Sequence, residues 1–511
     1  MDQQHAENTK RIAKNTLMLY VRMLFSMLVS LYTSRIVLQA LGVEDYGIYN
    51  VVGGVVGMLG FLNASMSGAT SRFLTFELGR CDVVRLKETF SSALVIHMCI
   101  ALVVFVVAET FGIWFLSNKL VIPDDRMFAA HIVYQLSIFS TMLGITQVPY
   151  NASIIAHEDM NVYAYVEILN VCLRLLIVYL LQIGNYDKLI LYAILVFGVS
   201  VLIRCIYRWY CIRNYEESRF RFIWKWGILK SMLNFSGWDL YGNVSVIFRQ
   251  QGVNILMNMF IGPVVNAASA IATSVGGVIM SFVGNVITAF RPQIIKSYSV
   301  QNYQEMFRLM NFAVKISIVL FLMLAIPLVY EMDFVLSVWL GIVPEYAADF
   351  CRILIITYCF TTVTSILNIG IHATGKVFLI SLISGTLILL AVPVIYVLLR
   401  NGFHPDYAYI CNGAVSAVVV VVNTYILKYI VPEFSIKSFC LDGCLKSIVI
   451  GGMVLFSVHF CIKSMESGWI RLICVTSVSV IESVVLAFLF LLDRKGKNVV
   501  LRKLHIPYSF K

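Results

Sequence analysis

The sequence predicts an all-α polytopic membrane protein of about fourteen transmembrane helices. We expect two six-helix lobes in pseudo-twofold relation, followed by two C-terminal helices. Three observations support this. Of 511 residues, 59% are hydrophobic and only 13% are charged, whereas a soluble domain has roughly 25% charged residues. Apolar runs of roughly 18 or more residues, each long enough to cross the bilayer, recur along the chain. Segments in the two halves also resemble each other, which indicates an internal repeat.

The apolar runs predict helices and not the strands of a barrel. They are continuously apolar, whereas barrel strands alternate between apolar and polar residues with a period of two. The predicted spans are 14–41, 46–71, 88–117, 128–155, 159–183, 187–208, 231–260, 264–290, 309–330, 349–372, 377–399, 406–428, 446–463 and 470–492.

The distribution of Lys and Arg predicts the orientation. With the N-terminus placed in the cytoplasm, 24 Lys and Arg residues fall in cytoplasmic segments and 6 in external ones. This excess follows the positive-inside rule for an even number of spans with both termini cytoplasmic. The net charge of +11 is therefore a topology signal, and nucleic acid is not an expected partner.

A polar segment and a repeated turn divide the chain. Arg213–Lys230 mixes basic and aromatic residues, as interfacial stretches do. Leu41-Gly42 and Ile261-Gly262 each end a long helix with a tight turn, and helices rich in small residues that allow close packing follow both turns. The predicted parts are the N-terminal lobe 1–212, the amphipathic cytoplasmic linker 213–230, the C-terminal lobe 231–431, and two further helices with a basic tail, 432–511.

Several charged residues lie inside the predicted spans. An ionised side chain at mid-membrane costs roughly 2.5–3.5 kcal/mol, so it normally faces a cavity or a partner. Glu167, Asn170 and Arg174 share one helical face. Arginines outnumber carboxylates at such positions, which predicts an anionic substrate, and the guanidinium fork suits phosphate. The substrate candidates are Arg22, Arg35, Arg174 and Arg249, with Arg291 and Lys315 as further cavity residues. Asp239, next to Trp238, is the best acidic candidate for ion coupling, and Glu167 is the second. The alternative role of Asp239 is neutralisation of Arg249 or another arginine, and that of Glu167 is a bridge to Arg174 through Asn170 or a neighbouring helix.

No pattern in the sequence predicts an enzyme. The external loops are too short for a catalytic domain, and no complete nucleotide-binding loop occurs. The twelve cysteines form no CxxC pair and have no metal-ligand spacing with histidine. We therefore expect no cofactor and no metal, and a transport process driven by protons, by sodium or by the membrane potential.

Two stretches resemble a known family. RIVLQALGVEDYGIYNVVGGVVGMLGFLNASMSGATSRFLTFELGR (35–80) is similar to the first two helices of bacterial polysaccharide exporters, the Wzx-type O-antigen flippases of the multidrug/oligosaccharidyl-lipid/polysaccharide superfamily. Gly42, Tyr46, Gly47 and Tyr49 match their first turn, and Arg72 matches the following helix. FRQQGVNILMNMFIGPVVNAASAIA (248–272) resembles the start of their second lobe.

The resemblance implies a two-lobed flippase for surface polysaccharide synthesis, in the bacterial cytoplasmic membrane. It would move a polyprenyl-diphosphate-linked oligosaccharide by alternating access, with Arg22, Arg35, Arg174 and Arg249 meeting the diphosphate. The implied partners are this lipid-linked oligosaccharide, membrane lipids, a polysaccharide polymerase and glycosyltransferases, and a monomer is expected. Three alternatives stay open: a multidrug or cation antiporter, a lipid II flippase of the same superfamily, and a membrane-embedded glycosyltransferase or polymerase.

Overall fold

The computed structural model describes residues 2–58, 61–119, 122–181, 186–223, 225–261, 263–341, 343–462, 465–491 and 497. Within these ranges the regular elements are all helices, and there is no strand. The chain forms two compact units, Met1–Leu240 and Tyr241–Lys511. The division falls inside helix α8 (Trp226–Phe260), beyond the predicted linker 213–230.

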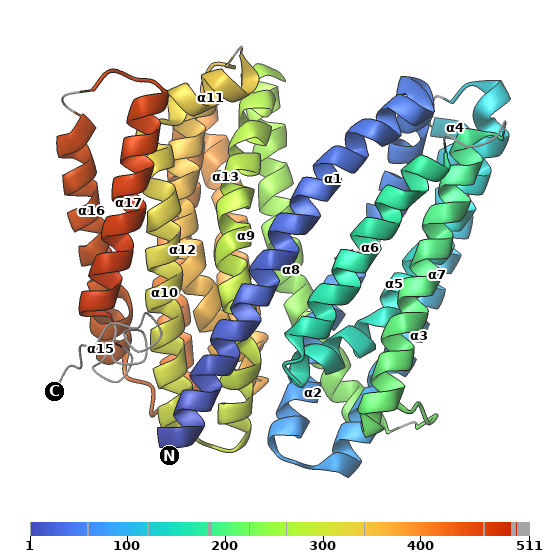
Figure 1. The fold of residues 1–511 in the computed structure, drawn as a ribbon, viewed down its shortest axis with the longest axis horizontal. Helices are drawn as coiled ribbons and strands as arrows, with labels where there is room; N and C mark the ends of the chain where they lie inside the picture. The colour runs from blue at the N-terminus through green and yellow to red at the C-terminus, as the bar shows by residue number, and fades with distance from the viewer. Residues whose placement is uncertain are drawn as a thin grey trace. The chain divides into compact units, whose positions relative to one another are not determined.

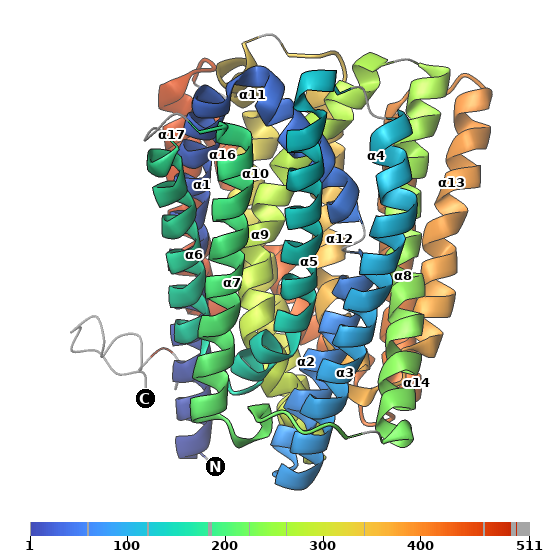
Figure 2. The same cartoon turned by 90° about the vertical axis from the view of Figure 1, so that its right-hand side faces the viewer.

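Unit 1 is a bundle of long helices in which α5, α6 and α7 run side by side and α1 packs against all three (Figures 1 and 2). A π-helical turn, Ala108–Gly112, joins α3 to α4, and short 3₁₀ turns occupy Asp124–Arg126 and Glu216–Ser218. Its helices are α1 (Asp2–Met58), α2 (Phe61–Gly79), α3 (Val83–Val107), α4 (Ile113–Lys119), α5 (Met127–Ala156), α6 (Met160–Leu180), α7 (Lys188–Asn214) and the first part of α8.

Unit 2 is centred on α12, which packs against α9, α10 and α14, while α16 and α17 pack together on α10 (Figure 1). π-Helical turns precede α13 (Ile380–Ser384) and α16 (Phe439–Leu445). The helices are α9 (Pro263–Ser299), α10 (Tyr303–Tyr330), α11 (Met332–Leu340), α12 (Ala347–Thr374), α13 (Gly385–Arg400), α14 (Asp406–Ile430), α15 (Ile436–Ser438), α16 (Lys446–Ile462) and α17 (Trp469–Phe490), besides the second part of α8.

The prediction of an all-α, multi-pass membrane protein is confirmed. Twelve helical segments in the described residues are long and apolar enough to cross a bilayer. The predicted spans 46–71 and 231–260 are not among the twelve. The first is divided between the end of α1 and the start of α2, and α8 carries the polar residues Asp239 and Arg249 within its length.

The surface matches a lipid environment. Phe456 and Phe460 on α16 are 75% and 74% exposed, and Ile470 on α17 is 74% exposed. In water such large apolar groups would favour burial, whereas acyl chains solvate them without cost.

The predicted turn at Leu41-Gly42 is present as a break inside α1. Gly42 has φ 82° and ψ 169°, a conformation that residues with a Cβ avoid. Both sides of the break remain helical. The matching Gly262 lies outside the described residues, but α8 ends at Phe260 and α9 begins at Pro263.

The predicted close packing of small residues holds for some glycines only. A Cβ added at Gly276 would come within 2.1 Å of Cε2 of Tyr358, so α9 approaches α12 closely there. The same addition at Gly53, Gly277 or Gly284 would meet nothing within 4 Å.

The segment that follows α7 is attached to unit 1 by polar contacts. Tyr215 Oη donates to Asp159 Oδ2 at 2.6 Å, and its ring stacks on His157 with centroids 4.1 Å apart. His157 Nε2 in turn contacts Glu217 Oε1 at 2.7 Å. Lys225 forms an ion pair with Glu88 of α3. Part of the predicted linker is therefore packed on the ends of α3 and α5.

The π-helical turn after α3 packs against a buried tyrosine. Tyr134 Oη on α5 donates to the carbonyl oxygen of Ala108 at 2.7 Å. Gly112, at the end of the turn, leaves room for this hydroxyl, because a Cβ there would lie 1.9 Å from Tyr134 Oη and 3.1 Å from Cζ.

We therefore expect Gly112→Ala to lower stability by about 1–3 kcal/mol through overpacking, measured as thermal unfolding of the purified protein in detergent. Adding Tyr134→Phe removes the clashing oxygen, so the cost of Gly112→Ala should be smaller in that background. Gly198→Ala is the control, since its Cβ meets nothing within 4 Å. Equal costs of Gly112→Ala in both backgrounds would contradict this account.

Candidate functional site

Unit 1 contains an open cavity of about 360 Å³. It is lined by the part of α1 that follows Gly42 and by α5, α6 and α7. Polar groups from the last three helices face it: Ser137, Ser140, Thr141, Gln147, Glu167, Asn170, Arg174 and Ser200.

The three polar residues predicted to share a face of one helix do line this cavity together. Glu167, Asn170 and Arg174 all lie on α6. Arg174 Nε donates to Asn170 Oδ1 at 3.3 Å, and Tyr207 Oη on α7 donates to Glu167 Oε1 at 3.2 Å. Glu167 and Arg174 do not form an ion pair with each other. The cavity wall therefore presents a carboxyl group and a separate guanidinium.

Arg22 lies next to the same group of residues. Its guanidinium stands 4.9 Å from the ring centroid of Tyr163, which is one turn before Glu167 on α6. The structure therefore places Arg22 of α1 beside the α6 turn that leads to Glu167.

Arg204 on α7 was not among the predicted site residues. It follows the cavity-lining Ile203, donates from Nε to Thr146 Oγ1 at 3.3 Å, and stands 4.5 Å from the ring centroid of Tyr150. Its Nη1 is buried and has no hydrogen-bond partner among the described residues. The signal that identifies it is the same one that selected Arg174, a cation inside a predicted span.

Seven of the described arginines fall into two groups. Near helix ends, Arg126, Arg352 and Arg471 pair with carboxylates, in the last case with the buried Glu331 at 2.7 Å. Far from helix ends, Arg22, Arg174, Arg204 and Arg249 form no ion pair in the described part of the chain, and their contacts are to aromatic, amide and hydroxyl groups. The guanidinium groups of the second group therefore have no carboxylate oxygen of a described residue within 4 Å, and Glu167 is the carboxylate that shares a cavity wall with one of them, Arg174.

Arg249 lies in unit 2, on α8, near Tyr358 of α12 and Cys411 of α14. It is thus placed in a different unit from the cavity of unit 1. Gly276 makes room for the same Tyr358 ring.

The remaining predicted residues lie apart from these clusters or are less fully described. Arg35 belongs to α1, but its side chain is outside the described residues. Asp239 in unit 1 faces α2, with Oδ2 3.9 Å from the position of a Cβ at Gly68. Arg291 is on α9 and Lys315 on α10 of unit 2, where the Lys315 carbonyl accepts from Ser447 Oγ at 3.4 Å. No cluster of three or more His, Cys, Asp or Glu side chains that would suit a metal ion occurs in the described ranges.

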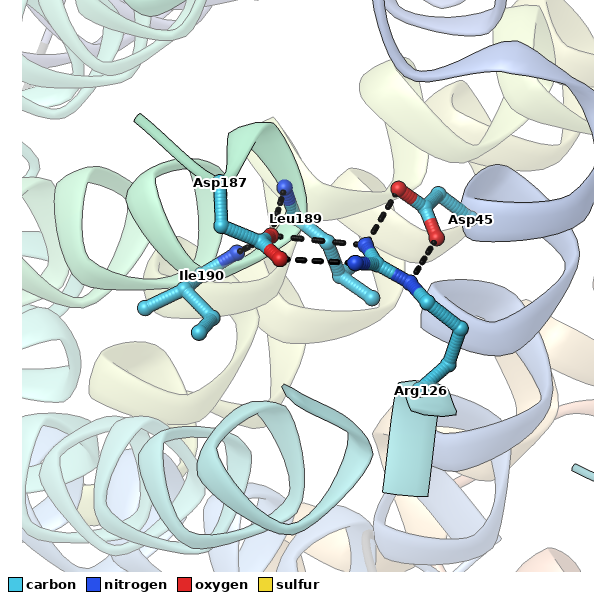
Figure 3. Close-up of polar contacts among 5 residues, drawn as sticks. All are labelled: Asp45, Arg126, Asp187, Leu189 and Ile190. Carbon is cyan, nitrogen blue, oxygen red and sulfur yellow. Dashed lines mark hydrogen bonds and ion pairs between the residues drawn. The ribbon is translucent and has the colours of Figure 1, made fainter. Parts of the chain in front are cut away.

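An ion network holds the helices that line the cavity of unit 1 (Figure 3). Arg126, just before α5, donates from Nε and Nη2 to Asp45 of α1 at 2.8 and 2.5 Å, and from Nη1 to Asp187 at 2.7 Å. Asp187 also caps α7, accepting from the backbone N–H groups of Leu189 and Ile190. One guanidinium therefore links α1, α5 and α7.

Comparison with known proteins identifies the fold. No protein-family model and no curated protein matches the sequence. Solved structures do match. An outward-facing multidrug resistance MATE family transporter of the MOP superfamily superposes with a TM-score of 0.70 at 13% identity, covering 84% of this chain and 97% of the solved one. A MATE structure in the bent conformation gives 0.71 at 14% identity, covering 83% and 96%.

The chain has the MATE transporter fold. A MOP superfamily transporter from Pyrococcus furiosus, whose binding pocket is described as reversed in polarity, also matches with a TM-score of 0.65 at 15% identity, covering 83% of this chain and 95% of that one. The MATE-like chains are covered almost completely, whereas part of this chain extends beyond each match.

The network around Arg126 predicts a pH dependence of stability. Burial raises the pKa of Asp187, but hydrogen bonds from Arg126 and from the backbone N–H groups of Ile190 and Leu189 outweigh it, so the pKa lies below its usual 3.8. A carboxyl with a lowered folded-state pKa contributes stability that is complete above its unfolded pKa and is lost as pH falls through the folded value.

At pH 7 we expect Asp187→Asn to lower the free energy of unfolding by about 1 kcal/mol. The cost is this small because the ion pair of Asp187 with Arg126 is partly exposed to solvent. The difference from wild type should shrink as the pH falls below about 4, as followed by thermal unfolding in detergent. Asp124→Asn, a change of an exposed carboxylate in the 3₁₀ turn that contains Arg126, is the control and should have no effect. A difference that is constant from pH 7 to pH 3 would show that the charge of Asp187 does not contribute.

Proposed function

We propose that this protein is a flippase that moves a polyprenyl-diphosphate-linked oligosaccharide across the cytoplasmic membrane by alternating access. The observation that carries the proposal is the set of mid-helix arginines without carboxylate partners. In a low-dielectric interior, an uncompensated guanidinium is stabilised most by an anion that enters the site. Two phosphates in series suit several arginines better than a single carboxylate does.

Arg174 and Arg249 are the residues we assign to the diphosphate. Arg174 lines the cavity of unit 1 with only an amide partner. Arg249 is flanked by a tyrosine and a cysteine in unit 2. For Arg174 the neighbouring amide accepts a hydrogen bond, and in neither case do these neighbours carry a carboxylate. Arg22 and Arg204 add positive charge beside the cavity of unit 1.

A multidrug or cation antiporter is the second candidate. It is favoured by the similarity of the fold to a multidrug resistance transporter, and by the carboxylate of Glu167 in the cavity wall. The matching Pyrococcus furiosus protein, with its reversed pocket polarity, supports different substrates on the same fold. A lipid II flippase also needs a diphosphate site, so the head group is what would distinguish it from the oligosaccharide flippase.

The decisive test is transbilayer movement in proteoliposomes of a polyprenyl diphosphate with a fluorescent sugar. We expect Arg174→Ala and Arg249→Ala each to slow movement by about tenfold or more, because a charge-assisted hydrogen bond contributes about 1.5–3 kcal/mol. Arg174→Lys should retain part of the activity, since it keeps the charge but loses the bidentate fork. Arg400→Ala, at the C-terminal end of α13, is the control.

A contrary result is wild-type protein that moves no lipid and instead exports a cationic dye in exchange for protons. That result would make the antiporter the correct function. Movement of lipid at the wild-type rate by both arginine variants would remove these residues from the substrate site.

A separate prediction concerns ion coupling, which we assign to Glu167. Glu167→Gln should leave binding of the lipid-linked sugar unchanged but abolish the response of transport to an imposed proton or sodium gradient, because the amide cannot exchange a proton or bind a cation as a carboxylate does. Tyr207→Phe, which removes only the hydrogen bond to Glu167, should keep the response. Asp239→Asn tests the other candidate in the same assay. If only Asp239→Asn abolishes the response, the coupling group is Asp239 and our assignment is wrong.

A further inference from the structure

A second pocket, in unit 2, is lined mostly by uncharged amides. It has a volume of about 410 Å³ and lies between α8 and α9. Its lining residues are Gln251, Asn254, Ile255, Asn258, Met259, Asn266 and Ala270. Four of these seven carry a carboxamide and none carries a charge. The pocket therefore offers hydrogen bonds without attracting either sign of ion.

Helix geometry explains how one segment supplies three of the amides. Gln251, Asn254 and Asn258 have the spacing i, i+3 and i+7, which places them on one face of α8. Asn266 faces them from the first turn of α9. Ile255 and Met259 supply apolar surface beside this row.

A chain of hydrogen bonds orients Asn254. Tyr409 Oη on α14 donates to Ser269 Oγ at 2.7 Å, and Ser269 Oγ donates to Asn254 Oδ1 at 2.8 Å. The Tyr409 ring is buried and stacks on Phe350 with centroids 4.3 Å apart. Because Oδ1 of Asn254 already accepts, its Nδ2 group is left to donate into the pocket.

Asn266 supplies the complementary group. Its Oδ1 atom is buried and accepts no hydrogen bond from any described residue. A buried acceptor without a donor is destabilising. The pocket thus combines the Asn254 amide, whose oxygen is held by Ser269, with the Asn266 amide, whose oxygen is closed off from solvent.

We propose that this amide pocket binds a neutral sugar, a hexose or N-acetylhexosamine, of the lipid-linked substrate. A sugar hydroxyl both donates and accepts, so it suits a pocket whose polar lining consists of carboxamides, while the C–H faces of the ring suit Ile255 and Met259. The inference rests on the proposed flippase function. It assigns recognition of the sugar to uncharged groups of unit 2 and separates it from recognition of the diphosphate by arginines.

The test compares two probes on the full-length protein in detergent: a short-chain polyprenyl diphosphate, and the same lipid carrying one N-acetylglucosamine or one glucose. Affinity is measured by ligand-induced thermal stabilisation. Wild type should bind at least one sugar-bearing probe more tightly than the bare lipid. In Asn254→Leu and Asn266→Leu we expect this preference to fall by about five- to tenfold, with affinity for the bare lipid unchanged.

The control is Asn161→Leu on α6, where Oδ1 is likewise buried without a partner in the described ranges but lines neither this pocket nor the cavity of unit 1. It should keep the preference. If the interior variants fail to fold, the combined Gln251→Ala and Asn258→Ala variant tests the same pocket at exposed positions.

Three results would overturn the inference. Variants with the wild-type preference would show that the pocket does not bind the sugar, as would a wild type that binds the bare and sugar-bearing lipids equally. Variants that lose affinity for the bare lipid as well would show a structural role. A wild type that binds neither lipid would contradict the proposed function itself, which separates that failure from the other three.

Discussion

An ionised side chain cannot be left without polar partners in hydrocarbon, and the interior of this protein is organised by that constraint. Three mid-helix arginines of unit 1 have neutral partners: a tyrosine face for Arg22, an amide for Arg174, and a hydroxyl with a second tyrosine face for Arg204. These partners stabilise the guanidinium without cancelling its charge. The positive potential is therefore retained inside the bundle, where an anionic head group would gain most from it.

The same constraint has a different outcome at the helix ends. Arg126 is bound by Asp45 and Asp187, and Arg471 is bound by Glu331. These cations are neutralised and hold elements together. In unit 1, Arg126 links α1, α5 and α7, and all three helices line the cavity. This ion network therefore positions the cavity wall that also contains Arg174.

The two units offer different chemistry to a ligand. The cavity of unit 1 has an arginine and a glutamate in its wall, whereas the pocket of unit 2 has only carboxamides as its polar groups. A substrate with a charged diphosphate and neutral sugars contains both kinds of group. A purely cationic drug would use the carboxylate of Glu167 but would have no use for the unpaired arginines, which is why we favour the lipid-linked substrate.

The sequence by itself determined the features that depend on local periodicity and on transfer to lipid. Hydropathy predicted an all-helical membrane protein, and the helical repeat placed Glu167, Asn170 and Arg174 on one face because their relative directions depend only on α6. The break at Gly42 was predictable from the sequence because it also depends on local residues alone. Only the tertiary structure brought Arg22 to Tyr163, added Arg204, and assembled the amide pocket from α8, α9 and Tyr409 of α14. Such neighbours come from segments far apart in the chain, and their approach depends on side-chain packing, which hydropathy and spacing do not contain. Gly276 and Gly277 illustrate this, since both are small but only the first faces a close helix.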